Sequence, residues 1–207
     1  MQTVRGDQAS VERRLCQGLL QCPCSGVLGP WGWTRERVIR TPAGAVAVKP
    51  RRSRCRSCGA THVLLPAWLF VRRAFAGALM WACVLARAAG SKIAAIGLRF
   101  GVRASTVASW LRRITGRADW WRQVLMDVLA LADGQVRRFV PARSALGDAV
   151  AVLDAVLVAL RGRHAQMAML TPPELASHLT RAHLFAPFLD LDGCNTSVFG
   201  MPASAHS

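Results

Sequence analysis

The spacing of apolar residues divides the chain into a part that predicts strands and a longer part that predicts helices. Between residues 22 and 66 the apolar runs are short, and sequences such as Thr41-Pro42-Ala43-Gly44 interrupt them. Short apolar runs bounded by Pro and Gly are typical of β-strands joined by turns. The three clearest runs are residues 38–40, 45–49 and 62–65. Residues 1–21 show no such pattern, and we expect them to form a loosely ordered leader.

From Arg72 onward the apolar residues recur every three or four positions, which predicts helices. The first predicted helix ends at Gly90, and two more follow at about residues 91–100 and 104–114. Three further helices are marked by residues suited to capping. The capping positions are Asp119, Ser144 and the box Thr171-Pro172-Pro173-Glu174. Residues 189–207 have no period, and we expect a tail there.

The helix that Ser144 begins carries an apolar stripe with a regular 4-3-4-3 spacing. Its members are Leu146, Val150, Leu153, Leu157 and Leu160. Such a stripe can pack on the neighbouring helices of the same chain. We expect this packing, and the alternatives are pairing with the same helix of a second protomer and binding of a separate recombinase or polymerase subunit.

The charge is concentrated in one part of the chain. Lys and Arg number 27 and Asp and Glu 11 among 207 residues, which gives a formal net charge of +16. Residues 1–118 hold 20 of the basic residues and only three acids, Asp7, Glu12 and Glu36. The densest run of positive charge is residues 49–56. This distribution favours a polyanionic partner such as DNA or RNA.

Several classes of protein are disfavoured by the same composition. The first 22 residues lack an apolar signal-peptide core. The uncharged apolar stretch at residues 74–86 is shorter than the ~20 residues that span a bilayer. Seven cysteines without a secretion signal indicate a reducing compartment. We therefore expect a cytoplasmic protein that does not enter a membrane.

Four cysteines have a spacing that suggests a metal site. Cys22-Pro23-Cys24 and Cys55-Arg56-Ser57-Cys58 are two close pairs, and a hairpin between them would bring the four thiols together. Zinc binds four thiolates in a tetrahedron, and a strand-rich segment this short would depend on the metal for much of its stability. The sequence therefore predicts one zinc ion held by Cys22, Cys24, Cys55 and Cys58.

The first pair weakens this interpretation, because only one residue separates its two cysteines. The usual knuckle turn needs two intervening residues, so that backbone amides can point at the sulfur atoms. Cys16 could replace Cys22 or Cys24 as a ligand, and His62 lies four residues after Cys58. A degenerate ribbon without metal is the remaining alternative.

Residues 91–114 have the pattern of a helix-turn-helix. Gly97 is a small residue where two helices would cross, and Gly101 lies four residues later at the turn. Val102 then packs inward, as this motif requires. Apolar residues fill the other inward positions, which are Ile96, Phe100, Val107, Trp110 and Leu111.

The second of these helices would be the recognition helix. Arg103, Ser105 and Ser109 would face base edges in the major groove, whereas Thr106, Arg112 and Arg113 would contact phosphates. Only Arg103 among the base-facing residues is long enough to pair with guanine, so we expect modest intrinsic specificity. The basic run adds further phosphate contacts from Arg51, Arg52, Arg54 and Arg56.

The order of these motifs resembles an uncharacterised family from high-GC bacteria that joins a zinc ribbon to a helix-turn-helix. The segments that carry the resemblance are residues 22–26, 31–35 and 50–66, together with Ser105-Thr106-Val107 and Trp110 to Arg113. The layout is also similar to the N-terminal DNA-binding region of insertion-sequence transposases. The resemblance covers residues 20–115 and implies DNA binding, in the setting of a mobile element. The shortened Cys22–Cys24 pair departs from the family pattern.

The sequence thus predicts a mainly α protein. We expect a leader at 1–21, a small zinc-ribbon-like β module at 22–66 and a three-helix helix-turn-helix domain at 67–117. A helical C-terminal region at 118–188 and a tail at 189–207 would follow.

We expect a DNA-binding protein without catalytic activity, either a transcriptional regulator or an accessory factor of a mobile element. The chain contains no Tyr, which excludes a tyrosine recombinase, and its later acids read as helix caps or solvated positions. The expected partners are double-stranded DNA and either a second protomer or a recombinase or transposase bound through the C-terminal helices. No small-molecule substrate is indicated. The alternatives are the DNA-recognition half of a transposase that lacks its catalytic domain, and an RNA-binding ribbon protein.

Overall fold

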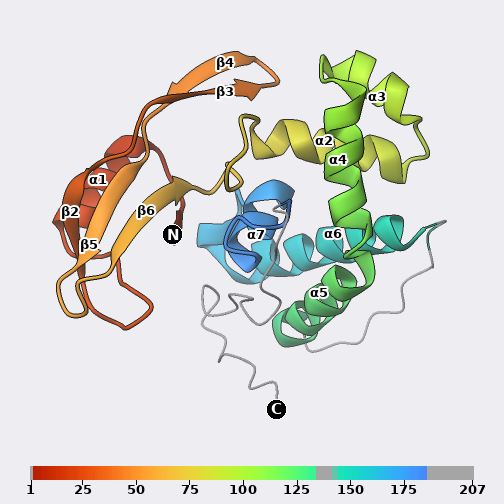
Figure 1. Cartoon of the computed structure of the whole chain (residues 1–207). Coiled ribbons are helices and arrows are strands. Elements are labelled where there is room, and N and C mark those ends of the chain that lie inside the picture. The colour runs from red at the N-terminus through yellow and green to blue at the C-terminus, as the bar shows by residue number, and fades with distance from the viewer. Residues whose placement is uncertain (1, 134–141, 143, 186–207) are drawn as a thin grey trace.

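The computed structural model describes residues 2–133, 142 and 144–185, and it is mainly helical with a small N-terminal sheet (Figure 1). The predicted tail lies outside the described residues. Four strands form the sheet in the order β1-β6-β5-β2, with β1 parallel to β6 and the other pairs antiparallel. Their bounds are β1 Gln2–Val4, β2 Leu28–Trp33, β5 Arg51–Cys55 and β6 Thr61–Pro66. This sheet and helix α1, Gln8–Cys16, are called the sheet module below.

The prediction of a loosely ordered leader was wrong. Strand β1 pairs with β6, and α1 buries Val11 and Leu15 against the sheet. Asp7 caps α1, because its carboxylate accepts a hydrogen bond of 2.7 Å from the amide of Ser10. Two buried residues in a nine-residue helix are too few to give a recognisable period, and β1 is stabilised by a partner about 60 positions away in the chain.

The predicted turn at residues 41–44 is confirmed. Strands β3, Arg37–Thr41, and β4, Gly44–Val48, form a two-stranded antiparallel hairpin in which Thr41 is opposite Gly44. The hairpin packs on the helices rather than on the sheet. Ile39 is fully buried in the helical core, and the backbone of Arg40 bonds to Ala74 and Ala76.

The helices follow in the predicted order. Their bounds are α2 Gly77–Ala88, α3 Ile93–Phe100, α4 Ala104–Thr115, α5 Ala118–Asp133, α6 Ala145–Arg163 and α7 Pro172–Leu179, with a 3-10 turn at Ala165–Met167. Ser144 caps α6 through the amide of Gly147, and Thr171 and Glu174 form the predicted capping box of α7. Asp119 does not cap α5, which starts one residue earlier, and instead lies in its first turn.

The described residues form two hydrophobic cores of very different size. The larger joins β3 and α2 to α7, so the two helical regions expected at 67–117 and 118–188 share one core, called the helical body below. Four members of the α6 stripe are buried there, against α5 and α7, and Val150 is partly buried. The smaller core lies within the sheet module. It consists of Val4, Val11, Leu15, Leu20, Cys22, Leu28, Cys55 and Leu64.

Candidate metal centre and nucleic-acid interface

The sheet brings the four predicted cysteines together. Cys55 ends β5, Cys58 lies in the turn that leads to β6, and Cys22 and Cys24 lie in the loop before β2. Leu28 of β2 is opposite Cys55, so this register places the first loop beside the second pair. The four sulfur atoms all lie within 4.8 Å of one another.

The spacing of the sulfurs fits a tetrahedral ion. A zinc–sulfur distance of about 2.3 Å places the sulfurs of a tetrahedron about 3.8 Å apart. Cys22 Sγ and Cys58 Sγ are separated by 3.8 Å, and Cys24 Sγ and Cys55 Sγ by 3.5 Å. Both distances are far longer than the ~2.05 Å of a disulfide, and all four side chains are free thiols. The cluster is compatible with a single zinc ion.

The second pair forms a knuckle turn. The amides of Ser57 and Cys58 donate to Cys55 Sγ at 3.4 and 3.5 Å. These donors, with that of Cys58 the stronger, lower the pKa of the Cys55 thiol to about 6 against the opposing effect of burial. A thiolate at this position is the form that binds a metal ion.

The first pair reaches the cluster through a different turn. The amide of Ser25 donates to Cys22 O, and that of Cys22 donates to Gly26 O, both at 2.8 Å. Ser25 adopts a left-handed conformation with φ of 66° to make this turn. This turn brings Cys22 and Cys24 to the cluster although only one residue separates them.

Gly26 is the residue that lets the two loops meet, and sequence analysis missed it. A Cβ at Gly26 would lie 2.6 Å from Cys55 Sγ and 2.5 Å from Ser57 Oγ. Real Cβ atoms do not approach other atoms this closely, so only glycine fits. Nothing in the local sequence indicates this, because the contact depends on pairing between distant segments.

Of the two alternative metal ligands, Cys16 lies away from the cysteine cluster and His62 lies beside it. Cys16 is exposed on α1 with its thiol 3.7 Å from the Glu12 carboxylate, and it does not belong to the cluster. His62 lies beside the cluster, with Nε2 3.3 Å from Cys22 Sγ. Burial lowers the pKa of His62, which favours the neutral ring. In this position His62 can donate an N–H to the Cys22 sulfur while four thiols complete the tetrahedron.

The arginines of β5 separate into two groups. Arg52 and Arg54 are exposed and alternate with the buried Ser53 and Cys55. Their side chains therefore project from the face of the sheet that α1 does not cover. We call this the open face. Arg56 is also exposed, in the turn after β5.

Arg51 was expected to contact DNA, but in the structure its side chain bonds to other residues of the sheet module. Its guanidinium bonds to the Glu12 carboxylate at 2.7 Å and to Gly32 O at 2.5 Å. It also lies 4.6 Å from the centre of the Trp33 ring. Since its side chain is only 11% exposed, Arg51 ties α1 to β2 and β5 and is not a free surface charge.

Trp31 of β2 was missed as a site residue, although the Trp31-Gly32-Trp33 sequence was noticed for its resemblance. The guanidinium carbon of Arg54 lies 4.7 Å from the centre of the Trp31 ring. Trp31 remains 50% exposed, whereas Trp33, which is 39% exposed, packs against Arg51 within the sheet module. A large aromatic side chain with the exposure of Trp31 on a basic surface is a signal for recognition.

Helices α3 and α4 form a tight hairpin at the predicted glycines. A Cβ at Gly97 would lie 2.7 Å from Val102 O, so only a glycine allows this approach. Gly101 ends α3 with φ of 63° and ψ of 30°, the left-handed conformation that glycine adopts readily. Val102 is buried, and its amide donates to Gly97 O at 2.9 Å.

The predicted DNA contacts of α4 differ in their exposure. Arg103, Ser105 and Arg112 are exposed, whereas Thr106, Ser109 and Arg113 are partly buried. Arg113 donates to Ser109 Oγ at 2.9 Å, so these two side chains hold one another. Arg103 precedes the first turn of α4, where the helix dipole adds positive potential.

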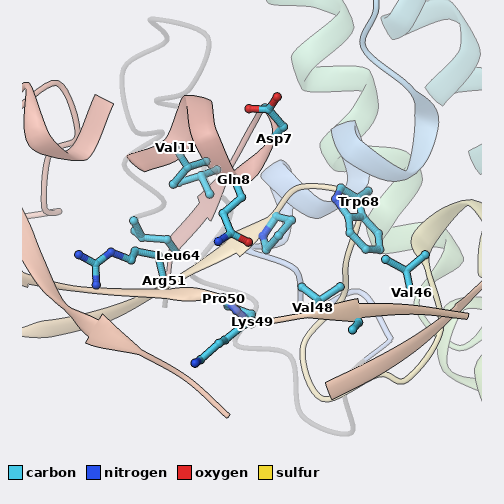
Figure 2. A pocket seen from close by; sticks show the side chains of 14 residues that line it. Asp7, Gln8, Val11, Val46, Val48, Lys49, Pro50, Arg51, Leu64 and Trp68 are labelled. Carbon is cyan, nitrogen blue, oxygen red and sulfur yellow. The ribbon is translucent and has the colours of Figure 1, made fainter. Parts of the chain in front are cut away.

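A separate cleft lies between the sheet module and the β3–β4 hairpin (Figure 2). Its volume is about 250 Å³, and its lining is largely apolar, with Val11, Val46, Val48 and Trp68 among the residues. The Asp7 carboxylate at its edge caps α1. The cleft includes neither the cysteines nor any residue of α4.

Comparison with protein-family models, with curated proteins and with solved structures gave no match. The interpretation of the site therefore rests on its own geometry. In the part of the chain that the structure describes, no helix has both the length and the apolar surface needed to cross a membrane.

Proposed function

We propose that this protein binds double-stranded DNA through α3 and α4, and that it acts without catalysis of its own as a regulator or accessory factor. The observation that carries the proposal is the close hairpin of α3 and α4. Gly97 and Gly101 are glycines at the two positions where a helix-turn-helix needs them, and Val102, directly after Gly101, is buried. An ordinary helical hairpin does not need a backbone approach at this position.

The charge of the surrounding chain supports the same function. No Asp or Glu occurs between Glu36 and Asp119, a stretch that includes β5, α3 and α4. The exposed Arg103 and Arg112 therefore have no neighbouring carboxylate in sequence to neutralise them. A surface of this kind attracts a phosphate backbone at long range.

In this proposal α4 is the recognition helix. Arg103 and Ser105 face base edges, and so does Ser109, one helical turn further along α4. The phosphate contacts come from Thr106, Arg112 and Arg113. Only Arg103 offers a bidentate pairing with guanine. We therefore expect binding to short, G-containing sites with modest discrimination.

The sheet module adds a second basic surface. We propose that one zinc ion, held by Cys22, Cys24, Cys55 and Cys58, fixes the end of β5, which carries Arg54, and the following turn, which carries Arg56. Zinc supplies structural cross-linking here, because four thiolates leave no open coordination position. Arg52, Arg54 and Arg56 then contact phosphates, and Arg51 supports them from within the module.

The test is selection of bound duplexes from a random DNA pool by the zinc-loaded full chain at near-physiological salt. We expect recovery of a motif, and we expect Arg103→Ala to change that motif. Arg112→Ala should weaken binding to all sequences without changing the motif. Arg13→Ala, which removes an exposed arginine of α1, is the matched control and should leave both unchanged. Failure of the wild-type chain to retain any duplex would overturn the proposal.

A further inference from the structure

We propose that the open face of the sheet binds an unpaired DNA strand, with one base stacked on Trp31. The inference rests on the proposed function only in taking DNA as the partner. It specifies that the strand whose phosphates Arg52, Arg54 and Arg56 contact is unpaired, whereas α4 contacts a duplex.

The β2 strand is built so that Trp31 lies on the open face. The register between β2 and β5 shifts between Pro30 and Gly32, so Trp31 is the extra residue of a bulge. After the bulge, Trp33 is opposite Arg51 and contacts its guanidinium, on the side where Arg51 bonds to α1. The bulge thus separates the two tryptophans, and Trp31 contacts Arg54 of the open face. Bulges commonly redirect a side chain in this way near functional sites.

Arg54 holds the Trp31 ring in place. Its guanidinium lies over the ring and also donates to Gly59 O at 3.1 Å, so Arg54 is itself fixed by the turn after the knuckle. Half of the Trp31 side chain is still exposed. A ring that is fixed before binding loses little conformational entropy when a base stacks on it.

A hollow suited to phosphate lies next to this ring. Its volume is about 600 Å³, and it is lined by Gly29, Pro30 and residues 54–59. The Arg56 guanidinium lies beside Gly29 at the edge of this hollow, since a Cβ at Gly29 would be in van der Waals contact with Arg56 Nε at 3.4 Å. Arg54 and Arg56 therefore present positive charge in an open hollow whose lining contains no carboxylate.

The combination favours an unpaired strand over a duplex. Bases inside a duplex are stacked on one another, so their faces cannot reach a side chain. Unpaired bases can stack on an aromatic ring while arginines follow the backbone, which is how many single-strand binding surfaces work. The outward-facing edge of α4 offers no aromatic residue of this kind, because Trp110 is buried.

The test uses the zinc-loaded full chain and a labelled oligothymidylate of about 20 nucleotides. Fluorescence anisotropy measures its dissociation constant for the wild type and for Trp31→Leu, Trp31→Phe and Trp33→Leu. We expect Trp31→Leu to weaken binding by on the order of ten- to a hundredfold, and Trp31→Phe to retain most of the affinity. Trp33→Leu is the matched control, because it removes an exposed tryptophan of the same strand, and it should bind as the wild type does.

A blunt duplex carrying the selected motif separates this proposal from the previous one. Trp31→Leu should bind that duplex normally, whereas Arg103→Ala should lose the motif and keep its affinity for oligothymidylate. Unchanged oligothymidylate binding by Trp31→Leu would overturn the inference, as would an equal loss in Trp33→Leu. Tighter binding of oligouridylate with the same dependence on Trp31 would replace DNA with RNA as the ligand.

Discussion

The backbone of Gly26 lies against the thiol of Cys55, with space for a hydrogen atom and not for a methyl group. This contact joins the loop that carries Cys22 and Cys24 to the knuckle that carries Cys55 and Cys58. Two pairs of thiols with 30 residues between them in the sequence can therefore occupy one tetrahedron.

We predict that Gly26→Ala prevents the cluster from closing around zinc. The added methyl group would lie 2.6 Å from Cys55 Sγ and 2.5 Å from Ser57 Oγ, so one loop must move away. Zinc content of the purified protein, measured by mass spectrometry, should fall well below one ion per chain. Gly162→Ala is the control, since a Cβ there meets nothing within 4 Å. A full complement of zinc in Gly26→Ala would contradict the assigned geometry.

Removal of the metal should affect the two cores unequally. The core of the sheet module has eight residues, and two of them, Cys22 and Cys55, belong to the cysteine cluster. A core this small needs a cross-link for stability. We predict that a chelator increases hydrogen exchange in β2, β5 and β6 and leaves α5 and α6 protected. Equal loss of protection in all of these elements would show that the helical body also depends on the ion.

Arg51 and Arg52 are neighbours in sequence that should behave differently. Arg51→Ala removes the bond to Glu12 and should lower the free energy of unfolding by about 1–2 kcal/mol. It should leave the salt dependence of DNA binding unchanged. Arg52→Ala should instead reduce the slope of log affinity against log salt by about 0.9, with little effect on stability. Denaturant titrations and binding measured over a range of salt concentrations check both expectations, and an exchange of the two results would reverse the roles.

Gly97 should tolerate substitution less well than Gly101. A Cβ at Gly97 would lie 2.7 Å from Val102 O, so Gly97→Ala should force α3 and α4 apart, cost on the order of 2 kcal/mol and weaken duplex binding. A Cβ at Gly101 meets nothing within 4 Å, and its φ of 63° costs an alanine only about 1 kcal/mol. Thermal unfolding and duplex affinity of the two variants measure the difference. Equal effects would mean that the crossing is not close.

His178 should make the protein less stable in mild acid. Burial, and to a smaller extent the charge of Arg5, lowers the pKa of this side chain to about 4, against the opposing effect of Glu174. The unfolded chain binds this proton near pH 6.5, so between about pH 6.5 and 4 it holds a proton that the folded chain does not. The free energy of unfolding should fall as the pH is lowered through this window and level off below it.

The check on His178 is the slope of stability against pH between about 5 and 6.5, above the range where most carboxylates titrate. His178→Leu should flatten this slope, because no group then titrates at that position. His183→Gln, which changes a partly buried histidine nearby in sequence, should keep it. An unchanged slope in His178→Leu would contradict the assignment.

Local patterns were sufficient to predict the helices and the cysteine cluster. The 3.6-residue period, the capping residues at Ser144 and Thr171 and the turn at residues 41–44 act within a few positions, and the structure agrees with them. The four cysteines were found because their side chains have few other roles at such a spacing. The helix-turn-helix identity and DNA binding stay predictions.

Features that depend on distant partners were not predictable. The alternating pattern of β5 predicts that the side chains of Arg51 and Arg52 project from opposite faces of the sheet. It does not predict that Glu12 of α1 lies on one of these faces and pairs with Arg51. Strand β1 exists because β6 pairs with it, and Gly26 is required because Cys55 lies opposite. Trp31 was visible in the sequence, but its role depends on a bulge that only the register reveals.

The β3–β4 hairpin has a mechanical consequence. The chain leaves the sheet after Trp33, docks Ile39 among the helices and returns to the sheet at Arg51. It crosses again after Pro66, so the two parts are joined by three passages of the chain, and the backbone bonds between Arg40 and residues 74–76 fix the hairpin to the helical body. A linkage of this kind resists hinge rotation. The sheet module and the helical body therefore keep a constant separation. A ligand long enough to touch both of them meets them at one fixed spacing.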